Sequence, residues 1–277
     1  MLAFKQHRVS PKSYIVIKSH MKHALPLIAV FASSAIMAQP TLTSANVGPA
    51  LGEMELSHFT QYVAAGPATA NFSFNVGPLT LMGANIDTVM AASTTPYAST
   101  FPNATLALIE GIGFSYYSYT SVDAAAVKYW GKAIASNDFY SNSDPEITLQ
   151  LPCSMGTNWT DDFSGTGLSS GESYSRTGSV TGHYNGYGTL ILPFGTFNNV
   201  ARIEVDEEYT DVYNGLTYHD TTMVVSYVIP GHTIFSSSTF IAPGNGGSPQ
   251  TTTSSTVIDP SSVVGIDELS SAANGLH

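Results

Sequence analysis

The chain has 277 residues and an unequal charge balance, with nine Lys and Arg against twenty Asp and Glu and a formal net charge of −11. Five of the nine basic residues, and none of the acidic ones, precede residue 39, so four basic residues remain beyond that point. Phosphate backbones and anionic membranes bind clusters of Lys and Arg, so this acidic surface excludes nucleic acid as a partner.

The first 38 residues have the layout of a secretory signal peptide. Lys22 and His23 precede an apolar run over 24–37, and a polar stretch follows Ala38, so we expect cleavage after Ala38. Residues 1–20 look like an upstream extension, with Met21 as an alternative start. A retained membrane anchor is disfavoured, because the run is shorter than the roughly 18 to 20 residues that a spanning helix needs. We therefore expect a secreted protein or one attached to the outer-membrane surface.

Residues 39–242 are predicted to form a β-rich region, with a possible break into two subdomains near residue 145. Segments rich in Tyr, Thr, Val and Ile alternate with Gly, Asn, Asp and Pro, which is typical of strands joined by turns. These segments are ATLALIEG, GFSYYSYTSV, AVKYWGKAIA, EITLQL, RTGSVTGHY, YGTLILP, NVARIEVDEEYTDVY and TTMVVSYVI. Within 121–134 three consecutive Ala residues favour a helix, but Tyr129, Trp130 and Gly131 favour a strand. Short connections predict an antiparallel meander.

The segment 189–205 predicts a hairpin that turns at Pro193 and Gly195. In its second strand, Ile203 and Val205 fall on one face and the charged residues Arg202, Glu204, Asp206 and Glu208 on the other. A sheet with one apolar face must cover it, so we expect a mainly β fold that forms either a sandwich or a curved incomplete barrel.

Beyond this region the composition changes twice. Residues 243–264 are rich in Gly, Pro, Ser and Thr, which predicts a flexible linker. From Val264 onward the chain regains Val, Ile and Leu, and residues 265–277 are interpreted as the truncated start of a C-terminal module.

Two parts of the chain resemble known secreted proteins. The segment VGIDELSSAANGLH after the linker resembles the lead-in to the C-terminal sorting module of type IX secretion cargo in Bacteroidota. The order LPCSMGTNWTDDFSGTG, GYGTLILPFGTFNNVARIEVDEEYTD and YVIPG, with an upstream YYSYTS hairpin, is similar to an arrangement in uncharacterised secreted proteins of these bacteria. The resemblance implies export across both membranes, with the type IX secretion machinery as a partner through the remainder of the sorting module. It implies no catalytic residues.

Signatures of common chemistry are absent from the sequence. It has no GxSxG elbow, HExxH pair, phosphate-binding GxxxxGK loop or CxxC pair. Cys153 is the single Cys, which rules out an internal disulfide and fits a buried small apolar residue better than a nucleophile. We therefore predict a passenger with a structural or adhesion-type role rather than an enzyme and rather than a protein with a bound cofactor. Two alternatives are a carbohydrate-binding module and a secreted glycoside hydrolase.

Two carboxylate groups make calcium a candidate ligand. Asp161 and Asp162 adjoin in a turn-like TDDFSG, and Asp206 and Glu208 share one strand. Calcium binds several hard oxygen ligands, but no loop has the alternating Asp spacing of a dedicated site, so a solvated, solubilising strand face is the favoured interpretation.

Aromatic residues make surface glycans a candidate partner. Tyr116, Tyr117 and Tyr119 lie on one predicted strand, with Trp130 and Trp159 further along the chain, and flat rings in a row can stack on sugars. Half-buried aromatics on a sheet face explain the same pattern without a ligand.

Two short motifs look like acceptors for the O-glycosylation of exported Bacteroidota proteins. Asp-Thr followed by an apolar residue or Thr places the acceptors at Thr88 and Thr221.

Overall fold

A computed structural model describes residues 39–111, 116–242, 248–259 and 264–265, and the contacts of these residues fall within one unit of the chain, residues 37–277. The predicted signal peptide, its cleavage point after Ala38 and residues 266–277 of the predicted sorting module lie outside the described residues.

The described chain consists almost entirely of strands, with a single 3-10 turn η1 (Ala92–Thr94) among the described residues. The strands are β1 (Glu53–Thr60), β2 (Ala70–Asn75), β3 (Leu81–Ala91), β4 (Leu106–Glu110), β5 (Tyr116–Val122), β6 (Ala126–Ala135), β7 (Asp138–Gln150), β8 (Asn158–Ser169), β9 (Glu172–Leu192), β10 (Gly195–Tyr213), β11 (Leu216–Ile229), β12 (His232–Ala242), β13 (Gln250–Ile258) and β14 (Val264–Gly265). No helix within these described ranges has the length and apolar character to span a membrane.

The predicted strands are confirmed, with differences in extent. The ambiguous stretch 121–134 contains the end of β5 and most of β6, so the strand interpretation was correct. RTGSVTGHY and YGTLILP are parts of one strand, β9, and the predicted hairpin is the β9–β10 pair, which begins at Leu192 opposite Gly195. Near residue 145 the strand β7 is continuous.

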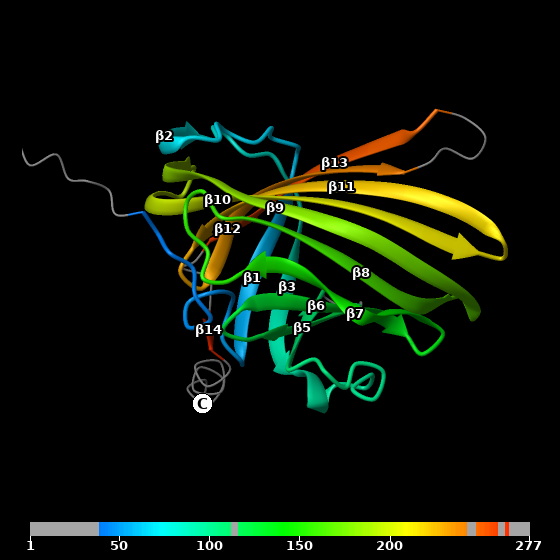
Figure 1. Ribbon diagram of the computed structural model, residues 1–277. Helices are drawn as coiled ribbons and strands as arrows, with labels where there is room; N and C mark the ends of the chain where they lie inside the picture. Colours follow the sequence, from blue (N-terminus) through cyan, green and yellow to red (C-terminus); the bar gives the residue numbers. More distant parts are fainter. Residues whose placement is uncertain (1–38, 112–115, 243–247, 260–263, 266–277) are drawn as a thin grey trace, which may run out of the picture. The chain divides into compact units, whose positions relative to one another are not determined.

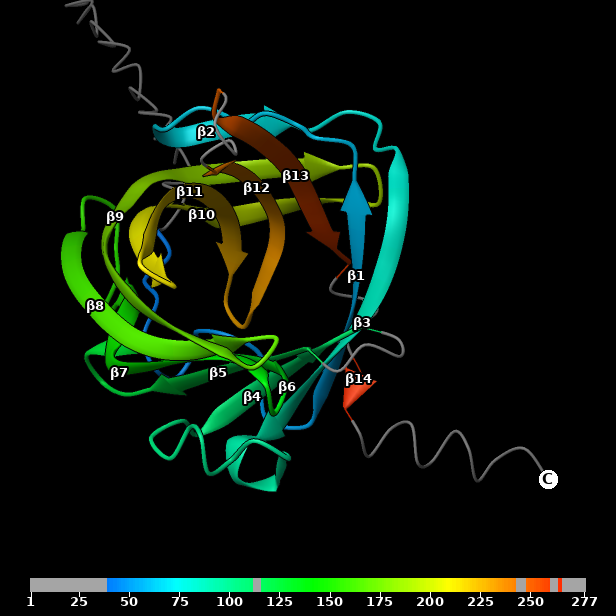
Figure 2. The ribbon, with the colours of Figure 1, turned by 90° about the vertical axis from the view of Figure 1, so that its right-hand side faces the viewer.

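The sheet is antiparallel, as predicted, but it closes on itself. From β3 to β13 each strand pairs with its neighbour in sequence, and β1 then pairs with both β3 and β13. Figure 2 shows the strands following one another around a ring. The expected sandwich or incomplete barrel is therefore wrong, because twelve strands form a closed barrel with β2 and β14 added outside the ring.

The strand that closes the ring lies in the segment predicted to be a linker. Residues 250–258 form β13, which pairs with β12 on one side and with β1 on the other, from Ser57 opposite Ile258 to Thr60 opposite Ser255. The sequence QTTTSSTVI has few apolar residues, but Thr is β-branched and favours extended backbone. Hydrogen bonds to β12 along one edge and to β1 along the other stabilise β13, although its composition is poor in apolar residues.

Irregular pairing allows the sheet to curl. Register shifts occur in β1–β3 at Phe59, in β9–β10 near Phe197 and Arg202, and in β11–β12 at Tyr227. Such bulges bend a strand and increase its twist, which is how a long antiparallel sheet can turn back to its own first strand.

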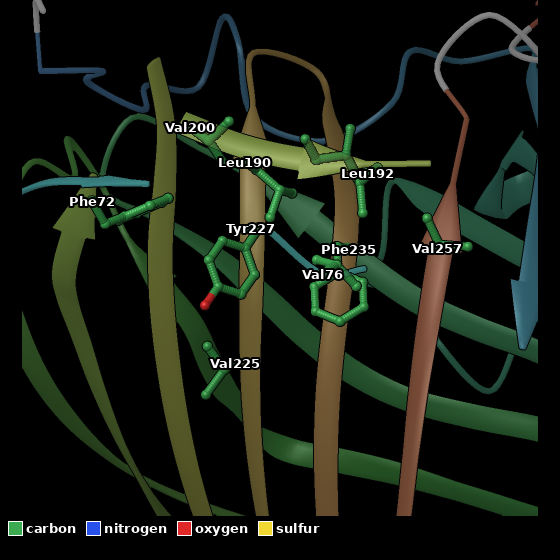
Figure 3. Close-up of a cluster of buried hydrophobic side chains, with 10 residues drawn as sticks. Phe72, Val76, Leu190, Leu192, Val200, Val225, Tyr227, Phe235 and Val257 are labelled. Carbon is green, nitrogen blue, oxygen red and sulfur yellow. The ribbon is translucent and has the colours of Figure 1, made fainter. Parts of the chain in front are cut away.

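A second layer covers the outer face of β11 to β13. Residues 61–79, which include β2, cross this face, and β2 pairs in parallel with the end of β9 (Figure 1). The apolar cluster beneath contains Phe72, Leu190, Tyr227, Phe235 and Val257, all buried (Figure 3). The hydroxyl of Tyr227 accepts a hydrogen bond from the amide of Gly66, with an N–O distance of 2.7 Å, and fixes this layer to the barrel.

We predict that closure depends on β13. In Thr256→Pro the substituted residue loses its amide hydrogen in a strand with two neighbours, where it lies opposite both Phe59 and Ser236. We expect the free energy of unfolding to fall by about 3 kcal/mol or more, measured by chemical denaturation. Ser248→Pro, just before the strand, is the matched control. Equal tolerance of both substitutions would contradict the closed barrel.

Candidate functional site

The interior of the barrel contains a cavity, here called the inner chamber, with a volume of about 490 Å³. Residues of β1, β3, β4, β6, β7 and β10 to β13 line it, so strands from every side of the ring contribute and the cavity lies within the lumen. On β11 the lining residues are Thr222, Val224, Ser226 and Val228, which alternate with residues that face outward. Successive side chains of a strand point to opposite faces, so each strand of a closed ring directs every second side chain inward. These inward side chains form the wall of the inner chamber.

The segment before β1 closes one end of the inner chamber. Leu42 and Cys153 exchange two backbone hydrogen bonds of 2.8 Å, and the hydroxyl of Tyr184 donates to the carbonyl of Pro40 at 2.9 Å. Further along, Val47, Gly48 and Pro49 contribute to the chamber wall. Residues 40–49 therefore act as a floor.

Most of the inner chamber wall is apolar. Its side chains include Leu108, Val127, Leu149, Ile203, Val205 and Ile258. A wall of this kind binds hydrocarbon groups by removing them from water, a gain of about 25 cal/mol for each Å² of apolar surface.

Two carboxylates, Glu146 of β7 and Glu207 of β10, interrupt the apolar wall. Neither has a hydrogen bond or ion-pair partner among the described residues, although Glu146 is only 6% exposed. Burial, followed by the negative charges of Glu207 and Asp161, raises the pKa of Glu146 to about 8, against the opposing effect of Arg176. Burial likewise raises the pKa of Glu207. Arg176 opposes this effect at both groups, and Lys132 also opposes it at Glu207, but within the described ranges neither carboxylate has the direct ion pair that a buried charge requires.

A second acidic group lies on the opposite wall. Glu55 of β1 accepts a hydrogen bond from Nδ1 of His232 at 2.6 Å, and Asp87 of β3 accepts one from the hydroxyl of Ser57 at 2.7 Å. The other oxygen of Asp87, Oδ1, is buried and has no hydrogen-bond partner among the residues that the structure describes. Burial raises the pKa of both carboxyl groups.

Beyond the carboxylates the lumen continues as a middle chamber of about 550 Å³ and an outer vestibule of about 410 Å³. The inner and middle chambers share Glu146, Thr148, Glu207 and Thr222, a set that we call the polar collar. The middle chamber and the vestibule share Lys132 and Arg176. The lumen therefore changes from apolar at its closed end to polar towards the hairpins that begin β9 and β11.

Arg176 is held rigidly at this boundary. Its Nε and one terminal nitrogen each donate to the carboxylate of Asp211 at 2.7 Å. Its guanidinium carbon lies 3.6 Å from the ring centroid of Tyr209 and 4.5 Å from that of Tyr140. Asp211 therefore neutralises the charge of Arg176 in a two-point ion pair.

The five aromatic residues predicted to stack on glycans do not form one row. Tyr117, Tyr119 and Trp130 pack on the outside of the barrel against residues 92–104, and Tyr119 is fully buried. Tyr116 lies on the opposite face of β5, beneath the ammonium of Lys132 at 5.5 Å. Trp159 is buried near the closed end, and a Cβ at Gly182 would lie 1.9 Å from its ring. A glycan-binding role remains a prediction, without this row to support it.

The four carboxylates proposed for calcium do not form one group, although two of them, Asp162 and Glu208, line a common depression. Asp161 accepts a hydrogen bond from the amide of Ile147 at 2.8 Å, whereas Asp162 and Glu208 line a shallow depression on the outer surface. Within the described ranges, no three His, Cys, Asp or Glu side chains are grouped closely enough to hold a metal. Calcium binding thus remains a prediction.

The remaining predicted residues are placed as follows. Thr88 and Thr221, the proposed glycosylation acceptors, are half-buried, on β3 and β11. Cys153 is buried, as predicted, and burial raises the pKa of its thiol to about 11, which keeps it protonated.

Sequence reasoning overlooked the lumen carboxylates, although a signal was present. The alternation that places Ile203 and Val205 on the apolar face of β10 also places Glu207, Tyr209 and Asp211 on that face. The acidic run was interpreted as a solvated face, which holds for Glu208, whereas on the same face Arg202 is buried and forms an ion pair with the half-buried Glu204. No comparable signal identifies Glu146.

Comparison with known proteins gave no match. No family model matches the chain, and no curated protein or solved structure is significantly similar to it. The function must therefore be argued from the lumen itself.

We predict that Glu146 makes stability depend on pH. The folded protein keeps this proton up to about pH 8, whereas the unfolded chain loses it near 4.5, so the folded state binds more protons between these values and stability falls as pH rises. Glu146→Gln cannot ionise. We expect it to exceed the wild type in unfolding free energy by about 1 kcal/mol or more at high pH and to match it below the lower value.

The measurement is urea denaturation at both ends of this pH range. Glu172→Gln, which changes an exposed carboxylate at the start of β9, is the matched control and should show no such gain. Parallel pH profiles for Glu146→Gln and the wild type would contradict the prediction.

Proposed function

We propose that the protein binds a small amphipathic molecule inside its barrel, as a carrier or receptor rather than as a catalyst. The observation that carries this proposal is the inner chamber of about 490 Å³, which is closed at one end, mostly apolar in its wall and bordered by the polar collar. Ligand pockets commonly have volumes of roughly 300 to 1,000 Å³ and combine apolar walls with a few polar groups that orient the ligand.

The number of strands also supports a ligand in the lumen. Side chains or one small ligand fill the interior of an eight-stranded barrel, and the interior widens as strands are added. The present ring has twelve strands, and its interior retains space in spite of inward-facing aromatic residues such as Tyr140 and Tyr209.

Glycoside hydrolysis is less well supported. That reaction needs one carboxyl group that stays protonated and a second that is ionised. Glu55, Asp87, Glu146 and Glu207 all line the inner chamber, and burial raises the pKa of each, so no pair among them is distinguished as one protonated and one ionised group.

The proposed location follows from the sequence pattern. The charged, apolar and polar order before residue 39 and the resemblance to type IX cargo support a protein that acts outside the cytoplasm. There a barrel of this kind would capture its ligand from the surrounding medium or the cell surface.

We predict that a neutral hydrophobic dye, N-phenyl-1-naphthylamine, binds in the inner chamber with a rise in fluorescence. Val224→Trp places a large ring in this chamber, because Val224 is part of its wall, and should weaken dye binding about tenfold or more. Met223→Trp is the matched control, since Met223 is the neighbouring residue, faces outward and is 37% exposed. Equal binding by both variants would show that the dye binds elsewhere.

A further inference from the structure

We propose that the ligand of the lumen is an aliphatic amine, whose protonated amino group lies between Glu146 and Glu207 and whose hydrocarbon part fills the inner chamber. This inference rests on the proposed function and names the chemical class of molecule that the same site takes.

The distribution of charge favours a cation. The four Lys and Arg beyond residue 38 are Lys128, Lys132, Arg176 and Arg202. All but Lys132 form ion pairs of 2.7 Å with a carboxylate. Lys132 is thus the one lumen Lys or Arg without an ion pair in the described part of the chain, and burial lowers its pKa. Several lumen carboxylates therefore have no fixed counter-ion.

The polar collar is where a cation would gain most. Glu146 is 6% exposed, borders both the inner and the middle chamber, and has no hydrogen-bond partner among the described residues. Glu207 borders the same two chambers from β10, on a different side of the ring. An ammonium group offers three donors and a positive charge, and so supplies what both carboxylates lack.

Aromatic rings in the middle chamber add to this preference. Tyr129 and Tyr209 line it together with the two carboxylates. The ring face of a Tyr attracts cations, and the guanidinium of Arg176 already lies over that of Tyr209, so Tyr129 is the ring that a ligand cation would meet. An anionic head group would instead meet Glu146 and Glu207, and Lys132 would be the one cation of this chamber's described lining without an ion pair, since Asp211 already neutralises Arg176.

The division of the lumen sets the shape of the ligand. The inner chamber, apolar and closed by residues 40–49, takes a hydrocarbon chain, and the collar at its open end takes the head group. Binding of an ammonium should also release the proton of Glu146, because the new positive charge opposes the effects of burial, Glu207 and Asp161 on its pKa and acts in the same direction as Arg176.

The test compares three ligands with the same alkyl chain: decylamine, decan-1-ol and decanoate. Each displaces N-phenyl-1-naphthylamine from the full chain in a fluorescence titration near neutral pH. We expect decylamine to bind at least about tenfold more tightly than decan-1-ol, and decanoate to bind most weakly. Proton release is measured for decylamine by calorimetry in two buffers of different ionisation enthalpy.

Two double variants, each of which replaces two carboxyl groups by amides, identify the site. Glu146→Gln combined with Glu207→Gln should bind decylamine and decan-1-ol equally. Asp144→Asn combined with Glu172→Gln replaces two exposed carboxyl groups in the same way and should keep the preference for the amine. If the first double variant does not fold, Glu207→Gln alone takes its place and should reduce the preference.

The outcomes separate the two proposals. If decan-1-ol or decanoate binds the wild type as tightly as decylamine, the amine proposal is overturned while the lumen remains a ligand site. If neither the dye nor any of the three ligands binds, the proposed function itself fails. An amine preference that survives loss of both carboxylates would place the cation elsewhere and overturn the assignment.

Discussion

The pairing of β13 with β1 joins the last long strand of the ring to the first. From β3 to β13 each strand needs only its neighbour in sequence, so a meander of this kind would otherwise end in two free edges, at β1 and at β13. Four residue pairs, from Ser57 opposite Ile258 to Thr60 opposite Ser255, close the gap. Unpaired edge strands invite association with other chains, and closure removes them. Closure also converts a curved sheet with two faces into a wall with an inside and an outside, which is the condition for a lumen.

Once the barrel is closed, the two faces of each strand meet different physical demands. On β11, Val224 and Ser226 face the lumen, whereas Val225 and Tyr227 face outward and still are buried, because residues 61–79 and the end of β9 cover them. The molecule therefore has one apolar core outside the barrel and a second inside its closed end, where Leu42 packs with Ile203 and Val228. Because two cores stabilise the fold, the rest of the interior can keep a cavity of about 490 Å³.

The electrostatic character of the lumen follows from the same closure. A carboxylate on an open sheet would be hydrated, but Glu146 and Glu207 lie inside a ring of strands where water is limited and Arg176 is already paired. Burial raises the pKa of both groups, and the negative charge of Glu207 raises that of Glu146 further. Groups arranged in this way store unfavourable energy that a complementary ligand can relieve, and perturbed carboxyl groups are common at functional sites for this reason. An ammonium group at the polar collar would be a complementary ligand of this kind.

The sequence by itself determined the strands of the central region, their antiparallel pairing and the apolar face of β10, because period-two alternation and turn residues are local signals. It also gave the burial of Cys153. Closure was invisible in the sequence, since β13 is a Thr-rich segment that only its two partner strands stabilise. The same limit applied to the site. Alternation could place Glu207 beside Val205, but only the closed ring brought it into one lumen with Glu146, about sixty residues earlier in the sequence. Contacts between distant strands depend on the geometry of the whole sheet, and no local pattern encodes them.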